Sequence, residues 1–278
     1  MTVDPASPDV GGDASGRSLG LGLDDLSSGE PALLLLTGWC SSRDRWAQVA
    51  PLLGARRRVV NFEWRGHGES APAHGDFGTA EMLQDALAVI DACELDQLIP
   101  CAASHAGWVA IELRRELGHR VPALVLLDWI VTEPEAEFVE LIGRLQSERD
   151  WRRARDTLLQ TWRGSVPRPE IDDALAVMRK HSARMWRRAG REIASSYTRY
   201  GSPVQALAEL DSPPRVLHLY GQPHSPDYLA AQRRFAGEHD WFRVKRLQVS
   251  SHFSMLEAPN DVAMAIDAVA AEVTERAK

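Results

Sequence analysis

Three residues that could act together in proton transfer or nucleophilic attack occur in the order Ser104, Asp128 and His252. Each lies just past a segment that we expect to form a strand, so all three could meet at one edge of a sheet. A neutral imidazole can take up a proton near neutral pH. An aspartate can hold that imidazole in the required tautomer and stabilise its charged form. We therefore interpret Ser104, Asp128 and His252 as the candidate catalytic residues.

Ser104 lies in the stretch PCAASHAGW, at positions 100–108. Small residues two positions before and after it, Ala102 and Ala106, suit a strained strand-to-helix turn that exposes a nucleophile. The usual pattern has glycine at both positions, and serine is also a favoured helix N-cap. This stretch alone leaves the nucleophile elbow and the N-cap as equally good interpretations.

Two acids compete for the role of partner to His252. Asp128 ends the apolar run 121–128 and is followed by further apolar residues, so a carboxylate there needs a buried partner. Asp227 also comes just after an expected strand. We favour Asp128 because its surroundings are apolar.

The loop 37–41 follows the continuous apolar run 31–36. In an enzyme with a serine elbow, this loop and the residue after the nucleophile supply backbone N–H groups that stabilise a developing negative charge. Those donors would be the N–H groups of Trp39 and His105. A tight turn around His67 follows the next expected strand, and we interpret His67 as structural.

The order of the elements predicts an α/β-hydrolase fold, with a mostly parallel sheet flanked by helices and an inserted helical cap. Strands are expected at 31–36, 58–62, 95–100, 121–128, 215–220 and 242–249. Helices are expected at 45–53, 79–93, 107–117, 138–145, 151–162, 171–188, 192–200 and 259–277. The predicted organisation is a disordered tail at 1–20, a hydrolase core at 21–131 and 211–278, and a cap at 132–210.

The composition limits the class of protein and of partner. The 278 residues carry a net charge of −7, so no nucleic-acid partner is expected. No apolar run is long enough to span a membrane and no secretory signal is visible. The three cysteines are an odd number in mostly apolar contexts, as in reduced cytoplasmic proteins. Since no metal-ligand spacing or glycine-rich dinucleotide motif occurs, no metal or other cofactor is expected.

Several clusters in the chain resemble the cofactor-independent 3-hydroxy-4-quinolone 2,4-dioxygenases. They are LLLLTGWC at 33–40, NFEWRGHG at 61–68, SHAGW at 104–108, Asp128-Trp129, Trp162, Trp186, YGSP at 200–203, Gln222-Pro223 and His252-Phe253. The Gly-Trp-Cys, Ser-His-x-Gly-Trp and Asp-Trp clusters are more specific than general hydrolase motifs. The resemblance covers nearly the whole chain after the expected tail.

The resemblance implies an α/β-hydrolase fold used for oxygenation without a cofactor. In that family the pair here formed by His252 and Asp128 removes the proton of the substrate's 3-hydroxyl, and the anion reacts directly with dioxygen. Ring cleavage then releases carbon monoxide and leaves an N-acyl-anthranilate. Ser104 would hydrogen-bond the substrate, the backbone of Trp39 would face the reacting centre, and Trp162 would shape the pocket from the cap.

Two positions depart from the family pattern. Ser41 and Ala103 stand where some members have histidine, which should alter how the ring N–H and the oxygens of the substrate are held. The expected partners are a small aromatic substrate and dioxygen. The residues expected to bind the substrate are Trp39, Ser41, His105, Trp162 and Trp186.

Two other functions remain open from the residues. The first is a serine hydrolase, such as an esterase, amidase or lactonase, that uses Ser104, His252 and Asp128 on a small aromatic substrate. The second is a small-ligand binding protein on the same fold, because a fold does not dictate a function. The oligomeric state also remains open.

Overall fold

The computed structural model describes residues 18–276. The expected disordered tail falls largely on residues 1–17, which lie outside the described residues, as does position 277 at the end of the expected last helix. Within 18–276, no helix is both long and apolar enough to cross a membrane.

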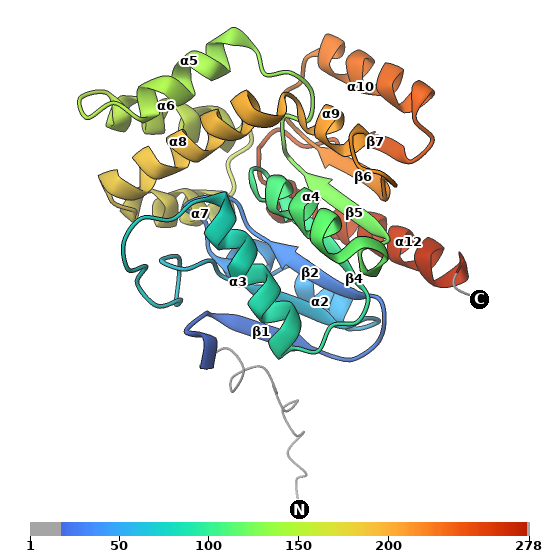
Figure 1. The fold of residues 1–278 in the computed structure, drawn as a ribbon. Helices are drawn as coiled ribbons and strands as arrows, with labels where there is room; N and C mark the ends of the chain where they lie inside the picture. Colours follow the sequence, from blue (N-terminus) through green and yellow to red (C-terminus); the bar gives the residue numbers. More distant parts are fainter. Residues whose placement is uncertain (1–17, 277–278) are drawn as a thin grey trace, which may run out of the picture.

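The core is a seven-stranded sheet with the order β1-β3-β2-β4-β5-β6-β7 (Figure 1). β1 runs antiparallel to β3, and every other neighbouring pair is parallel. The strands are β1 (Leu23–Leu26), β2 (Ala32–Leu36), β3 (Val59–Phe62), β4 (Leu98–Ala103), β5 (Ala123–Leu127), β6 (Arg215–Tyr220) and β7 (Phe242–Arg246). This mostly parallel sheet confirms the predicted fold class.

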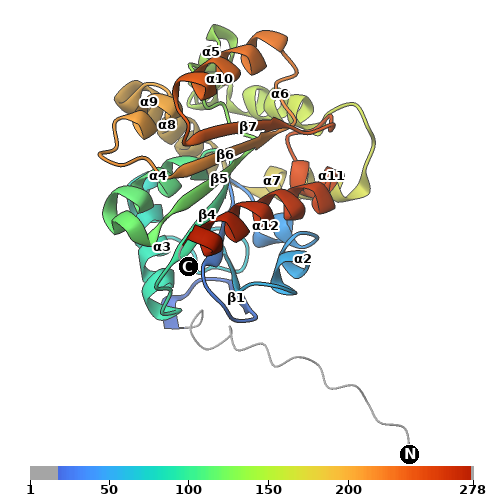
Figure 2. The ribbon, with the colours of Figure 1, turned by 90° about the vertical axis from the view of Figure 1, so that its right-hand side faces the viewer.

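Helices cover both faces of the sheet, which explains the continuous apolar strands. In β2, all five residues are fully buried, as expected of a strand with helices on each side. Figure 2 shows α3 (Thr79–Ala92) and α4 (Ala106–Leu117) on one face and α2 (Ala50–Gly54) and α12 (Pro259–Arg276) on the other. The core therefore has three layers, and loops at the carboxyl ends of the strands are the places where a site can form.

Five helices are inserted between β5 and β6, and we call them the inserted helices. They are α5 (Ala136–Leu145), α6 (Trp151–Arg163), α7 (Pro169–Lys180), α8 (Ala183–Tyr200) and α9 (Pro203–Ala208). Figure 1 shows α5, α6 and α8 together on one side of the sheet, where α5 packs against both α6 and α8. The division between core and cap at residues 132 and 210 stays a prediction.

Some elements differ from the expectation. The helix expected at 171–188 is broken, because the Ser182 hydroxyl accepts the Met185 N–H at 3.3 Å and starts α8. β4 lies three residues later than expected, so Ser104 follows it directly. β1 and α10 (Pro226–Glu238) were not expected; β1 is an edge strand that carries two aspartates and has no apolar run. The remaining short elements are η1 (Arg43–Trp46), η2 (Gly118–Arg120) and α11 (Ser254–Glu257).

Candidate active site

Ser104 forms the turn between β4 and α4 and has a left-handed backbone angle, φ = 54°. Its N–H donates to the Leu127 carbonyl at 2.8 Å, which ties the turn to β5. No side chain caps α4, whose N-cap residue is His105. A Cβ on Gly38 would lie 3.2 Å from Ser104 Cβ, so glycine allows the loop after β2 to approach closely. The geometry is that of a strained elbow and not of an N-cap.

Asp128 follows β5, and its side chain is only 1% exposed. Its Oδ1 accepts the Gly221 N–H and its Oδ2 accepts the Ser254 N–H, both at 2.9 Å. Burial raises the pKa of Asp128, while these hydrogen bonds and the charge of Arg45 act in the opposite direction. Asp227, the rival acid, is exposed in the first turn of α10. The partners that a buried carboxylate requires are thus main-chain N–H groups.

His252 lies in the loop after β7 and contacts α6. Its N–H donates to the Trp162 carbonyl at 2.8 Å, and its ring stacks on the Trp162 indole with centroids 4.9 Å apart. Burial lowers the pKa of His252 to about 3, and the positive charge of Arg45 acts in the same direction. The imidazole is therefore neutral at neutral pH, which is the protonation state that a general base requires.

The His252 ring makes no hydrogen bond to Asp128 or to Ser104 in the part of the chain that the structure describes. Both oxygens of Asp128 retain a lone pair, since each accepts one main-chain N–H. Hydrogen bonds of this kind often tighten only when substrate is bound. The residues share a site, and a substrate would complete the connection between them.

The loop that carries His252 is held at several points. Glu257 accepts the N–H groups of Ser250 and Ser251, both at 2.9 Å, one with each carboxylate oxygen. The Gln222 side-chain amide donates to the Ser250 carbonyl at 2.6 Å. Gln222 therefore helps to fix the backbone from which the His252 imidazole projects.

Two backbone N–H donors at the site have no acceptor in the described part of the chain, one in the loop after β2 and one in the elbow. The N–H groups of Trp39 and His105 have no acceptor among the described residues. His67 braces this loop, because its Nε2 accepts the Cys40 N–H at 3.0 Å while its Nδ1 lies 3.1 Å from the Arg65 carbonyl. Burial lowers the pKa of His67 to about 3, in keeping with a neutral structural residue.

The His105 side chain has one ring nitrogen in use and one free. Its Nε2 lies 3.2 Å from the Thr79 hydroxyl, which donates to Glu192 at 3.3 Å. The hydroxyl must then accept from Nε2–H, so Nδ1 is left as an acceptor. Nδ1 is buried and has no partner among the described residues. Burial lowers the pKa of His105 to about 3, so this ring is also neutral.

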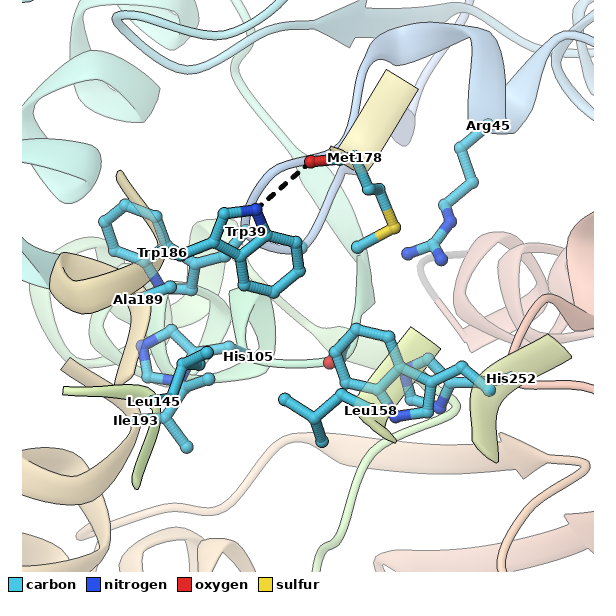
Figure 3. Close-up of a pocket in the computed structure, with 13 residues that line it drawn as sticks. Trp39, Arg45, His105, Leu145, Leu158, Met178, Trp186, Ala189, Ile193 and His252 are labelled. Atoms are coloured by element: carbon cyan, nitrogen blue, oxygen red, sulfur yellow. Dashed lines mark hydrogen bonds between the residues drawn. The ribbon is translucent and has the colours of Figure 1, made fainter. Parts of the chain in front are cut away.

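Two adjoining cavities lie between the strand ends and the inserted helices. The smaller has a volume of about 20 Å³ and the larger about 640 Å³. The residues common to both walls are Ser104, His105, Leu158, Trp162, Ile193 and His252. Figure 3 shows the small cavity, which residues of the core and residues of α5, α6, α7 and α8 line together. In its wall, the Trp186 indole N–H donates to the Met178 carbonyl at 3.2 Å.

Most of the predicted site residues line these cavities. Those at the small cavity are Trp39, Ser104, His105, Trp162, Trp186 and His252, and Asp128 lines the large one. Ser41 is buried but is not among the residues that line either cavity. The chain turns at Cys40, where φ is 60°, and Ser41 lies beyond that turn. The structure therefore does not bring Ser41 to the site with the others.

The aromatic residues next to the motifs pack on one another behind the site. A Cβ on Gly107 would lie 2.2 Å from the Trp129 ring, so glycine is required there. Trp108 meets Trp129 edge to face at 5.1 Å and stacks on Tyr200 at 5.3 Å. The Tyr228 hydroxyl donates to the Trp129 carbonyl at 2.8 Å. This cluster fixes α4 against the loop that carries Asp128.

Sequence reasoning missed Arg45, which lines the small cavity. The sequence around it, Arg43-Asp44-Arg45-Trp46, is typical of a solvated turn. Arg43 is indeed ion-paired with Glu63 at 2.9 Å, whereas Arg45 is buried. No pattern in the sequence distinguishes the two arginines, because only the packing of η1 decides which one faces inward. Among residues 18–276, no group of three His, Cys, Asp or Glu side chains is arranged as metal ligands.

Comparison with known proteins gives both the broad family and the narrower group. The model of the alpha/beta hydrolase family matches residues 33–265. A 2-heptyl-3-hydroxy-4(1H)-quinolone dioxygenase of Mycobacteroides abscessus is 37% identical over 243 residues, which are 86% of this chain and 90% of the relative. A 1H-3-hydroxy-4-oxoquinoline 2,4-dioxygenase of Pseudomonas putida is 33% identical over 85% of this chain and 90% of its own length.

A solved structure extends the similarity to three dimensions. It is an AqdC variant in complex with its substrate, described as a basis for recognition and ring-cleavage of the Pseudomonas quinolone signal. It superposes with a TM-score of 0.86 at 34% identity and covers 91% of this chain and 96% of that protein. The resemblance predicted from the motifs is confirmed: the chain belongs to the alpha/beta hydrolase family and, within it, to the 3-hydroxy-4-quinolone 2,4-dioxygenases.

Proposed function

We propose that this protein is a cofactor-independent dioxygenase that cleaves the ring of a 2-alkyl-3-hydroxy-4(1H)-quinolone or a similar N-heteroaromatic enol. One observation carries the proposal. A half-buried, neutral His252 and a buried Asp128 line the same cavity as the elbow residue Ser104. The relatives that are 33–37% identical over most of the chain are named as dioxygenases of such quinolones, which supports the choice of substrate.

The reaction begins with a proton transfer to His252. The O–H bond of the substrate's 3-hydroxyl breaks, the proton goes to the imidazole, and the electron pair stays on the substrate. Asp128 stabilises the imidazolium by its charge. The electron-rich anion then reduces dioxygen directly, and C2 and C4 each form a bond to one of its oxygen atoms. The bonds from C3 to C2 and C4 break, so C3 leaves as carbon monoxide and an N-acyl-anthranilate remains. The proton held by His252 then passes to the product carboxylate or to solvent and regenerates the neutral imidazole, so substrate and dioxygen account for every atom of the products.

The other polar groups of the cavity position the substrate. The Ser104 hydroxyl, which has no hydrogen-bond partner among the described residues, donates to a substrate oxygen. The free N–H groups of Trp39 and His105 stabilise negative charge that develops during the reaction. The free Nδ1 of His105 is an acceptor suited to the ring N–H of the substrate. Trp162 and Trp186 form aromatic walls from the inserted helices.

The larger cavity accommodates the 2-alkyl chain. Its volume of about 640 Å³ and the apolar side chains of Phe138, Leu141 and Ile193 in its wall suit a chain of several methylene groups. We also propose a cytoplasmic location, which the three unpaired and buried cysteines support.

The test is turnover of a 2-alkyl-3-hydroxy-4(1H)-quinolone with a chelator present, under air and under nitrogen. We expect oxygen-dependent loss of substrate and stoichiometric carbon monoxide, with both atoms of labelled dioxygen in the acyl-anthranilate. His252→Ala should lower the rate by about 10²–10⁴-fold, as loss of a general base does. Ser104→Ala should retain measurable turnover, because the serine forms no covalent intermediate in this mechanism.

A serine hydrolase is the second candidate, and the free N–H groups of Trp39 and His105 favour it because they resemble an oxyanion hole. Hydrolysis of aryl esters under nitrogen, stoichiometric labelling of Ser104 by a fluorophosphonate and complete loss of activity in Ser104→Ala would establish the hydrolase and exclude the dioxygenase.

A further inference from the structure

Arg45 is a buried cation with unused hydrogen-bond donors. Its side chain is only 4% exposed, and its guanidinium lies 4.1 Å above the centre of the Phe253 ring. Its Nε and Nη2 groups are buried and have no acceptor among the described residues. Arg43, two positions earlier on η1, bonds to the carboxylates of Asp24 and Glu63. Because an unpaired buried charge is costly, a compensating ligand is the natural explanation for Arg45.

The guanidinium faces the small cavity. Figure 3 shows the Arg45 side chain running from η1 into the site, with its charged end toward Met178 and His252. The volume of about 20 Å³ holds roughly one water-sized group, such as a single oxygen substituent of a larger molecule. The Trp39 indole N–H in the same wall is also buried and unpartnered. The cavity thus offers the positive charge and the unused donors of Arg45 to one small anionic group.

Other charged and titratable groups around Arg45 leave this role open. Asp128 attracts Arg45 electrostatically, but its two oxygens are bonded to the N–H groups of Gly221 and Ser254. His252 and His105 are neutral imidazoles in the cavity wall. Glu257, on the α11 helix that packs against η1, is engaged by backbone N–H groups. Burial lowers the pKa of Arg45 to about 10, so it keeps its charge at neutral pH.

We propose that Arg45 binds the oxyanion of the ionised substrate in the small cavity and so promotes its deprotonation. This inference rests on the proposed dioxygenase function. When the 3-hydroxyl proton moves to His252, the electron pair left on the oxygen lies against the guanidinium. The charge of Arg45 disfavours the imidazolium of His252, and the carboxylate of Asp128 offsets this effect. A full charge at about 6 Å in the effective dielectric of a protein site changes such an ionisation equilibrium by about 10- to 100-fold.

The test is an anaerobic pH titration of the bound 2-alkyl-3-hydroxy-4-quinolone, followed by the absorbance change that accompanies ionisation of the ring hydroxyl. Without dioxygen the complex stops at the proton-transfer step. In Arg45→Met, we expect the ratio of ionised to neutral bound substrate to fall by about 10- to 100-fold at a given pH. Arg45→Lys, which keeps the charge, should remain much closer to wild type.

Arg188 provides a matched control. It is also buried, at 5% exposed, and its guanidinium also lies over an aromatic ring, 4.0 Å from the centre of Phe77. It is, however, ion-paired with Asp76 at 2.8 Å and does not line the small cavity. Arg188→Met should lower the melting temperature but leave the ionisation of bound substrate unchanged.

Each outcome is decisive. If wild type ionises the substrate and folded Arg45→Met does so equally well or better, Arg45 has only a structural role and this inference is wrong. If Arg45→Met does not fold, Arg45→Gln gives the same comparison, and Arg45→Lys must still ionise the substrate as wild type does. If wild type neither ionises nor converts the quinolone, the proposed function itself fails.

Discussion

Asp128→Asn is the substitution that separates the catalytic and structural roles of the buried carboxylate. The side chain keeps its size and loses its charge. Oδ1 and Oδ2 each accept a main-chain N–H at 2.9 Å, from Gly221 and Ser254. An asparagine has one oxygen and one NH₂ group, so one of these N–H groups must face a donor. Arg45 also loses the electrostatic attraction of Asp128, with which it forms no hydrogen bond.

The structure sets the size of the expected effects. A hydrogen bond to a charged group contributes about 1.5–3 kcal/mol, and leaving its buried donor unsatisfied adds to that loss. We therefore expect Asp128→Asn to lower the free energy of unfolding by about 2–4 kcal/mol, or the melting temperature by about 5–10 °C. Because the imidazolium of His252 is no longer stabilised, the rate of quinolone cleavage should fall by about 10²–10⁴-fold.

The assay is quinolone cleavage at saturating substrate, with a urea melt of each variant. Asp85→Asn is the control for stability. Asp85 is a buried carboxylate outside the site, and its Oδ1 lies 2.6 Å from Nη2 of Arg65, with which it forms an ion pair. It should destabilise the protein and leave the rate nearly unchanged. Asp227→Asn tests the rival acid. If Asp227→Asn removes activity while Asp128→Asn keeps it, our assignment of the acid is refuted.

Two further substitutions test the packing behind the site and the environment of the base. Gly107→Ala puts a Cβ 2.2 Å from the Trp129 ring and should lower the free energy of unfolding by about 2 kcal/mol or more. Gly143 lies in open space on α5, so Gly143→Ala should raise the free energy of unfolding by about 0.5–1 kcal/mol. A denaturant melt of each variant measures both effects. Equal effects of the two alanines would contradict the packing argument. Trp162→Ala removes the ring stacked on His252 and admits water, so the depressed pKa of His252 should rise from about 3 toward its ordinary value. The acid limb of the pH–rate profile should then move to higher pH. An unmoved limb would show that burial by Trp162 does not control this pKa.

The fold and the position of the main polar residues could be predicted from the sequence because both depend on local patterns. Buried parallel strands leave continuous apolar runs, and polar residues that follow those runs meet at one sheet edge. Ser104 and Asp128 were located in this way, and His252 was located by its place after the last expected strand, in which polar and apolar residues are mixed. Segment boundaries could not be predicted in the same way. The break at Ser182 depends on a single cap hydrogen bond inside a pattern that otherwise continues as a helix.

Features that depend on the direction of one side chain could not be predicted. Arg43 and Arg45 have the same side chain and nearly the same neighbours, yet one is ion-paired and the other is buried over Phe253. The left-handed backbone at Cys40 carries Ser41 away from the cavities, although the motif places it beside Trp39. Both outcomes follow from tertiary packing, which periodicity does not record.

The site divides its tasks between two parts of the fold. The polar groups come from loops at the strand ends, where hydrogen bonds to the core hold Ser104 and Asp128 in place. The apolar walls, including Leu158 and Ile193, come from the inserted helices. In such a setting little water is available to stabilise the substrate anion. Proton transfer to a neutral base therefore depends on charged groups that are held in fixed positions around the anion. A scaffold shared with hydrolases can therefore support proton removal without a serine nucleophile, provided that a fixed cation replaces the excluded water.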